Sequence, residues 1–506
     1  MVLIEIIANI GARLVIGAAQ LFFAPLYITL LGIEAYGLIG FYLTLLGTLL
    51  CIDQAISPAV TRVFATAQGE GNQIAIQQAW RTFHTLERLS LGLGVTLGVA
   101  LFLAAPWAAR TFLHTNALSR DTVETALALM AGILIAQWPS FVYAGALAGL
   151  RKQVSLNLLR SVGALLQFTV GVGLVYWAGA DITGLLAWHI ACSALISGAM
   201  RIQLSRLGGV VRTRSQNLLP LRALDWTFAI GNLGIGILGT ILTQFDKLLV
   251  AKLAPLHAFT AYSLTFAAAS LIPSLIAQPF LAVLFPHLSA IFARQDFPGL
   301  EMEYRRITQC IMALACPVAA AFCFYPQAII SFWIPNQPAL ADEIALLLPW
   351  VTLGMLFNTI MTVPLSLQLA SGWTSLSFYK NLAILPLYFV VMLYGFSSLG
   401  PLVGALCWFG VNFSYYLFEV PLMHRRLLKS AMWPWWIKDT LTPLVLTGFF
   451  FWGCSLSNPI VEPGHGILWA VLAQTLLAMM ALALLLPFSR QLIRQFVIHK
   501  FNRKTR

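Results

Sequence analysis

The chain alternates between long apolar stretches and short segments that hold most of its polar residues. About 14 of the stretches are long enough to cross a bilayer, since a transmembrane helix needs about 20 mainly apolar residues. They lie at residues 2–30, 36–60, 86–110, 123–150, 155–178, 182–204, 225–252, 258–287, 307–334, 343–370, 378–396, 400–423, 438–457 and 465–488. The pattern predicts an all-α, polytopic membrane protein with about 14 transmembrane helices.

The basic residues fall mainly on one side of this arrangement. Of the 30 Lys and Arg residues, 25 lie in even-numbered loops and the C-terminal tail, and the remaining five are Arg13, Arg110, Arg120, Lys247 and Lys252. The fourth loop, for example, carries Arg151, Lys152 and Arg160. Because cytoplasmic loops are enriched in Lys and Arg, we expect these loops and both termini in the cytoplasm.

Composition excludes several classes of protein. Hydrophobic residues make up 59% of the chain and charged residues 9%, whereas soluble domains have about 25% charged residues. We interpret the net charge of +12 as a topology signal and a contact for anionic membrane lipids, and expect no nucleic-acid partner. The seven cysteines lack metal-ligand spacing. No phosphate-binding loop motif occurs, which argues against an ATP-driven pump. Because no loop is long enough for a soluble catalytic domain, we expect no metal, cofactor or catalytic residue, and no enzyme.

An internal repeat divides most of the chain into halves. Asn9-Ile10-Gly11 aligns with Asn232-Leu233-Gly234, and the same offset places Gln20 over Thr243. Both repeats start on odd-numbered spans, so the halves have the same orientation in the membrane, and parallel halves of this kind usually enclose a central cavity. Spans 13 and 14 have no counterpart and are interpreted as an appended pair.

The first span carries a polar stripe. Glu5, Asn9, Arg13 and Gln20 fall within about 80° of the helix circumference at 100° per residue. Arg13 lies near the bilayer midplane, where a charge is costly and needs an explanation. Two interpretations remain open: Arg13 pairs with a carboxylate, either Glu5 or Asp53, or it binds an anionic substrate such as a phosphate.

The seventh span has a similar stripe. Asn232, Thr243, Asp246 and Lys247 share one side of the helix, and Asp246-Lys247 is either an interfacial ion pair or part of the substrate path. Taking both stripes together, the candidate substrate-binding residues are Arg13, Asn9, Gln20, Lys247, Asn232 and Thr243. The candidates for coupling or gating are Glu5, Asp53 and Asp246. His189 on the sixth span is interpreted as a helix contact in preference to a proton relay.

Two segments resemble a known family. Asn9-Ile10-Gly11 followed by Leu30-Leu31-Gly32-Ile33-Glu34-Ala35-Tyr36-Gly37-Leu38 resembles the start of Wzx-type polysaccharide-unit flippases of the multidrug/oligosaccharidyl-lipid/polysaccharide exporter superfamily. Asp246-Lys247 is similar to an Asp-basic pair in the second lobe of those proteins. The resemblance implies two six-helix lobes in a V around a central cavity, at residues 1–210 and 211–430, with the two extra helices and a basic cytoplasmic tail at 431–506.

The resemblance also implies a function in O-antigen and lipopolysaccharide assembly. The substrate would be an undecaprenyl-pyrophosphate-linked oligosaccharide, moved across the bacterial inner membrane by alternating access. Coupling to an H⁺ or Na⁺ gradient or to the membrane potential, and a polysaccharide polymerase as partner, are compatible with the sequence. The alternatives are a lipid II flippase, which the count of 14 spans favours, a multidrug antiporter, and a membrane glycosyltransferase or polymerase, against which the short loops argue.

Overall fold

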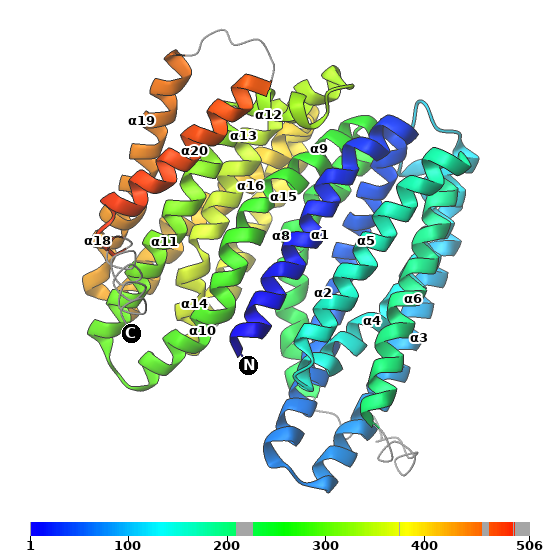
Figure 1. Cartoon of the computed structure of the whole chain (residues 1–506), viewed down its shortest axis with the longest axis horizontal. Helices are drawn as coiled ribbons and strands as arrows, with labels where there is room; N and C mark the ends of the chain where they lie inside the picture. Colours follow the sequence, from blue (N-terminus) through cyan, green and yellow to red (C-terminus); the bar gives the residue numbers. More distant parts are fainter. Residues whose placement is uncertain (1, 209–225, 374, 458–464, 489, 491–506) are drawn as a thin grey trace, which may run out of the picture. The chain divides into compact units, whose positions relative to one another are not determined.

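The computed structural model describes residues 2–208, 226–373, 375–457, 465–488 and 490, and within these ranges every regular element is a helix (Figure 1). The first half of the chain forms α1 (Val2–Leu31), α2 (Ile33–Glu70), α3 (Gln73–Thr111), α4 (Arg120–Gly149), α5 (Gln153–Ala178), α6 (Ile182–Gly208), α8 (Trp226–Leu253) and α9 (Leu256–Ala269). The all-α prediction is confirmed.

The second half contains mostly shorter helices, several of them joined by short π-helical or 3₁₀ turns. They are η2 (Pro273–Ala277), α10 (Gln278–Ala293), α11 (Phe297–Phe324), α12 (Pro326–Trp333), α13 (Pro338–Ile360), α14 (Thr362–Ala370), α15 (Ser375–Leu399), α16 (Leu402–Ser414), η3 (Tyr415–Glu419), α17 (Val420–Leu427), η4 (Lys429–Ala431), α18 (Met432–Pro434), η5 (Trp435–Leu441), α19 (Thr442–Ser457) and α20 (His465–Leu485). Here η2, η3 and η5 are π-helical turns, a local widening that lets a helix continue past a proline or a bend.

The expected membrane spans correspond to these helices. In the described part of the chain, 11 helices are long and apolar enough to cross a membrane, and each overlaps a span expected from the sequence. The other three expected spans coincide with α8, with α16 continued by η3 and α17, and with η5 continued by α19. The protein is a multi-pass membrane protein.

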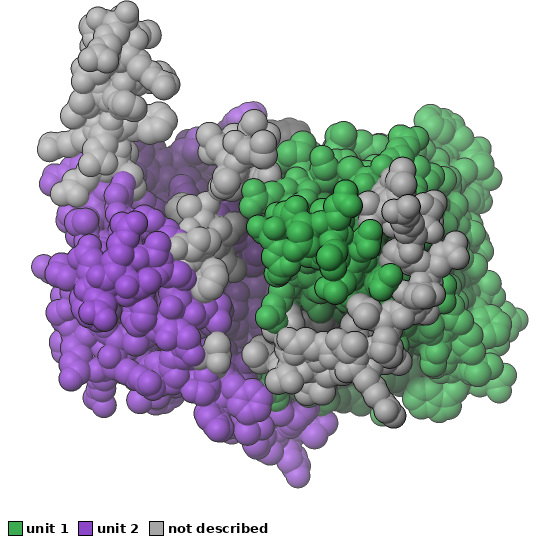
Figure 2. Space-filling view, turned by 90° about the horizontal axis from the view of Figure 1, so that it is seen from below, with its two compact units in different colours: residues 1–263 green, residues 264–506 purple. Residues whose placement is uncertain are grey.

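Two compact units divide the chain, Met1–Ser263 and Leu264–Arg506, coloured green and purple in Figure 2. Below they are called unit 1 and unit 2. The sequence predicted a boundary at residue 210, which would place α8 at the start of the second lobe. In the structure α8 packs against α2 and is counted with unit 1. The assignment of lobes to 1–210, 211–430 and 431–506 stays a prediction.

Unit 1 is built around α4, which packs against α2, α3 and α6, while α1 packs against α5. The buried side of α4 includes Leu127, Met130 and Trp138. In a membrane, helices associate through close packing and small residues more than through hydrophobicity. Gly37 and Gly47 of α2 show this, because an added Cβ would lie 2.5 Å from Thr260 Oγ1 and 2.8 Å from Gln244 Nε2 respectively. Their small size allows α2 to approach α8 and α9.

The glutamate of the segment 30–38 has a defined structural role. Both carboxylate oxygens of Glu34 accept hydrogen bonds from the backbone N–H groups of Asn116, Ala117 and Leu118, at 2.9, 2.8 and 3.1 Å. These residues lie in the connection between α3 and α4. Because the bonds are charge-assisted, Glu34 fixes this loop against the start of α2.

We expect Glu34→Ala to release the loop. Losing a charged acceptor should cost about 1.5–3 kcal/mol of stability, and the amide hydrogens of residues 116–118 should exchange at least about tenfold faster, since 1.4 kcal/mol corresponds to tenfold in an opening equilibrium. Hydrogen-exchange mass spectrometry of the purified protein measures this. The matched control is Glu70→Ala at the exposed far end of α2, which should leave exchange in the loop unchanged. Equal exchange in both variants would contradict the assigned role.

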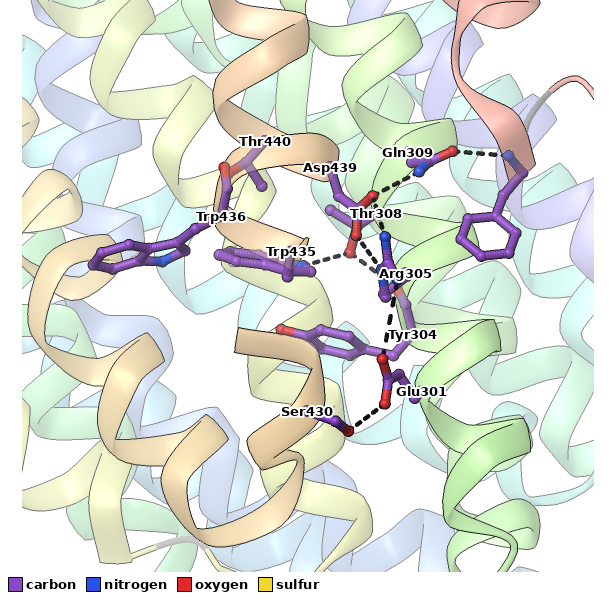
Figure 3. A network of polar contacts seen from close by, with 11 residues as sticks. Glu301, Tyr304, Arg305, Thr308, Gln309, Ser430, Trp435, Trp436, Asp439 and Thr440 are labelled. Carbon is purple, nitrogen blue, oxygen red and sulfur yellow. Dashed lines mark hydrogen bonds and ion pairs between the residues drawn. The ribbon is translucent and has the colours of Figure 1, made fainter. Parts of the chain in front are cut away.

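In unit 2 a buried polar network joins three elements (Figure 3). Asp439 of η5 is fully buried and accepts hydrogen bonds from Arg305 Nε at 2.6 Å and Gln309 Nε2 at 2.6 Å, both on α11. Gln309 Oε1 in turn accepts from the backbone N–H of Phe488, just beyond α20, at 3.0 Å. The start of the predicted thirteenth span is therefore held against α11 by charge-assisted bonds, and the end of α20 by a neutral hydrogen bond.

Candidate functional site

Unit 1 contains a cavity of about 440 Å³ between α1, α2, α4, α5 and α6. Its size falls within the range of about 300–1,000 Å³ typical of small-molecule sites. The polar lining residues are Gln20, Ser140, Gln137, Arg160, Gln167, His189 and Ser193. Aromatic side chains complete the wall, namely Tyr27, Tyr36, Tyr42, Phe141 and Phe168.

Hydrogen bonds across the helices hold parts of this wall in place. Tyr27 of α1 donates to the carbonyl of Phe168 on α5 at 3.1 Å, and Tyr42 of α2 donates to Gln137 Oε1 of α4 at 2.5 Å. Each bond joins helices that are distant in the sequence. The two hydroxyl groups thus fix the positions of these rings in the cavity wall.

His189 of α6 differs from the other wall residues. Its side chain is 3% exposed, lines the cavity and makes no hydrogen bond to another described residue through either ring nitrogen. Among the described residues, the structure therefore does not support the sequence interpretation of His189 as a hydrogen-bonded helix contact, because neither ring nitrogen forms a hydrogen bond to one of them.

A positive cluster adjoins the cavity. Arg160 lines the cavity wall. The charges of Asp53 and Arg13 are close enough to act on its guanidinium group. Arg13 itself is exposed on α1. With two guanidinium groups and one carboxyl group, the cluster keeps at least one positive charge in excess, since arginine stays protonated in any plausible protein site. Such a cluster can bind an anion such as a phosphate.

Arg160 was not among the site residues predicted from the sequence, where it was counted with the basic residues of a cytoplasmic loop. In the structure this residue lies inside α5, eight residues after Lys152, the residue that precedes the helix. At 1.5 Å per residue this is about 12 Å from the helix start. That depth was available from the sequence, because the predicted span began before the arginine.

The other candidates of the first stripe have different environments. Asn9 Oδ1 accepts a hydrogen bond from Asn157 Nδ2 of α5 at 2.6 Å, so Asn9 contributes to the packing of α1 on α5. Gln20 is exposed and lines the cavity. The side chains of Glu5 and Asn232 lie outside the described residues, so their assignments stay predictions.

The candidates on α8 form a compact polar group. Lys247 Nζ lies 3.2 Å from Asp246 Oδ2 and donates to the carbonyl of Thr243 at 2.7 Å. Tyr262 of α9 donates to the same carboxylate at 2.5 Å. The Thr243 hydroxyl donates to the carbonyl of Gly239 at 2.9 Å. Asp246 and Lys247 thus form an ion pair within unit 1, and the role of either residue toward a substrate stays a prediction.

Solved structures show which fold this is. A lipid II flippase MurJ in an inward closed conformation superposes with a TM-score of 0.74 at 14% identity, covering 97% of this chain and 100% of that chain. An inward-facing MATE multidrug transporter of the MOP superfamily gives a TM-score of 0.63 at 13% identity, covering 83% of this chain and 99% of that chain. A variant of the Vibrio cholerae MATE transporter VcmN gives a TM-score of 0.56 at 13% identity, covering 84% of this chain and 96% of that chain. At these identities the likeness concerns the fold.

The sequence itself identifies the family. A search of curated proteins finds no significant match. The family model described as "Polysaccharide biosynthesis protein" matches residues 30–337, more than half of the chain. This match starts at the segment Leu30–Leu38 from which the resemblance was inferred, and it confirms that resemblance at the level of a polysaccharide biosynthesis family. The chain belongs to the polysaccharide biosynthesis protein family.

Proposed function

We propose that this protein moves an undecaprenyl-pyrophosphate-linked oligosaccharide from the cytoplasmic to the periplasmic leaflet of the bacterial inner membrane by alternating access. The observation that supports it most is the cluster of Arg13, Asp53 and Arg160, with its excess positive charge inside a membrane protein. A charge at membrane depth costs at least about 2.5–3.5 kcal/mol, and an anionic substrate such as a pyrophosphate offsets that cost.

Topology and energy supply are part of the same proposal. Both termini lie in the cytoplasm, as the distribution of Lys and Arg indicates. The conformational cycle is coupled to an H⁺ or Na⁺ gradient or to the membrane potential, and Glu5, Asp53 and Asp246 are the candidate coupling residues. The substrate is handed to a polysaccharide polymerase on the periplasmic side. The protein acts as a transporter, without catalytic residues of its own.

A lipid II flippase is the second candidate. It is favoured by the fold likeness to the MurJ structure, which extends over 97% of this chain. Both substrates present a pyrophosphate, so the positive cluster suits either. A cationic drug is a poorer fit, because two arginines would repel it. Flipping assays in proteoliposomes, with lipid II and an undecaprenyl-pyrophosphate-linked oligosaccharide offered separately, decide between the two.

Substitution of Arg13 tests the role of the positive cluster. We expect Arg13→Ala to reduce flipping of the lipid-linked oligosaccharide at least about tenfold, since a charge-assisted contact is worth about 1.5–3 kcal/mol. Arg13→Lys should retain part of the activity, because an ammonium keeps the charge and loses the two-pronged geometry that matches phosphate oxygens.

The measurement is flipping by equal amounts of reconstituted protein. Arg110→Ala, at the exposed end of α3, is the control and should be as active as the unsubstituted protein. Full activity of Arg13→Ala would refute the role of Arg13 in substrate binding. Disappearance of this variant from the membrane would instead indicate a structural ion pair.

A further inference from the structure

We propose that the cavity of unit 1 binds the sugar residues nearest the pyrophosphate, while Arg160 in its wall faces the pyrophosphate itself. This inference rests on the proposed function and assigns one part of the substrate to one place. It predicts that affinity depends on the sugar separately from the charged lipid.

The lining has the chemistry of a carbohydrate site. Sugar hydroxyl groups both donate and accept hydrogen bonds, and the amides of Gln20, Gln137 and Gln167 offer both functions. The Gln137 carbonyl oxygen already accepts from Tyr42, so its N–H₂ group is the part that we expect to donate to a ligand. Aromatic faces such as those of Tyr36 and Phe168 pack against the apolar C–H faces of a sugar ring.

His189 provides an independent indication of a ligand. It is almost completely buried, lines the cavity and makes no hydrogen bond through either nitrogen to a residue that the structure describes. A buried polar group without a partner costs about 1–3 kcal/mol. A neutral imidazole has one donor and one acceptor. A hydroxyl group of the sugar can satisfy one of them, and a neighbouring hydroxyl or amide group of the sugar can satisfy the other.

The charge of the lining distinguishes this ligand from others. Among the described residues that form the wall, Arg160 is the one with a permanent charge, and no carboxylate is present. A cationic ligand would find no counter-ion there, and a purely apolar ligand would leave the amides and His189 unsatisfied. A neutral polyhydroxylated group attached to a diphosphate fits both the cavity and its charged wall.

The test compares two lipids on the full-length protein in nanodiscs. The probes are undecaprenyl pyrophosphate and the same lipid carrying one N-acetylhexosamine. We expect the sugar-bearing lipid to bind at least about tenfold more tightly, equivalent to ~1.4 kcal/mol. Ala164→Phe, which places a bulky ring in the cavity, and His189→Leu should remove this difference and leave the affinity for undecaprenyl pyrophosphate within about twofold, because neither substitution changes a charge.

Two further variants make the comparison specific. Ala178→Phe makes the same change at the exposed end of α5 and should keep the preference for the sugar-bearing lipid. His189→Gln restores a donor and an acceptor and should recover part of the preference. Thermal unfolding of each variant checks that the fold is intact, and Ala164→Phe carries the test if His189→Leu does not fold.

Each result has a definite meaning. A preference that persists in folded Ala164→Phe would place the sugar elsewhere and overturn the inference. Equal affinities for both lipids in the unsubstituted protein would also overturn it, while leaving the proposed function intact. If neither lipid binds, the proposed function itself fails, and the inference fails with it.

Discussion

A disulfide between cysteines introduced at Gly40 and Ser263 should abolish flipping completely and reversibly. A Cβ added at Gly40 of α2 would lie 3.1 Å from the Cβ of Ser263 on α9, and disulfides have Cβ–Cβ separations of about 3.5–4.5 Å. The helices therefore need to separate by only a few tenths of an ångström to form the bond. Both positions are near the ends of α2 and α9 that the topology assigns to the periplasmic side. The lobes predicted from the sequence place α2 in residues 1–210 and α9 in residues 211–430. The proposed alternating access would separate these helices on the periplasmic side, so a covalent link between them should hold that side closed.

The experiment uses a background in which the seven native cysteines are replaced. Mild oxidation should stop flipping in the double variant, and reduction should restore it. The single variants Gly40→Cys and Ser263→Cys, oxidised in the same way, are the controls and should remain active. Undiminished flipping by fully cross-linked protein would show that α2 and α9 stay together throughout the cycle.

Removal of the buried carboxylate of Asp439 should have the largest effect on stability. Asp439→Leu leaves the guanidinium of Arg305 and the amide of Gln309 without their shared acceptor. Breaking a buried ion pair by removing one partner costs about 3–5 kcal/mol, because the remaining charge stays in a poorly solvated place. We expect the free energy of unfolding to fall by about this amount, measured by denaturant titration in detergent.

A double variant separates the loss of the pair from the loss of packing. Asp439→Leu combined with Arg305→Leu removes both charges and should be more stable than Asp439→Leu alone, since replacing a whole buried pair by apolar residues is often nearly neutral. The exposed carboxylate variant Asp342→Leu is the control and should change the free energy of unfolding by less than about 1 kcal/mol. A double variant no more stable than Asp439→Leu would show that the charge left on Arg305 is not the cause.

The membrane spans could be predicted from the sequence because bilayer thickness fixes the length of an apolar helix. The depth of Arg13 in the membrane, and the position of Gln20 on the same side of the helix, followed from the regular geometry of a helix. The segment around Glu34 identified the family, although its physical role emerged only when the loop at 116–118 was seen against its carboxylate.

The partners of buried charges could not be predicted. Arg305 and Lys380 were counted as loop residues of the cytoplasmic side, yet Arg305 pairs with Asp439, 134 positions away, and Lys380 pairs with Glu419 of η3. Counting charges by loop gives the side of the membrane and contains no information about which helices pack together. The same limit applies to the cavity, because five helices define it and no single one carries its pattern.

The Arg305–Asp439 pair also has a consequence for how the protein is made. At about 5–20 residues per second, the ribosome completes Asp439 roughly 7–27 s after Arg305. During that interval α11 has entered the membrane with a guanidinium group whose buried counter-ion does not yet exist. Unit 2 can therefore reach its final packing only when the C-terminal segment has been synthesised and inserted. A defect in the last two helices should be recognised by quality-control proteases as a defect of the whole unit.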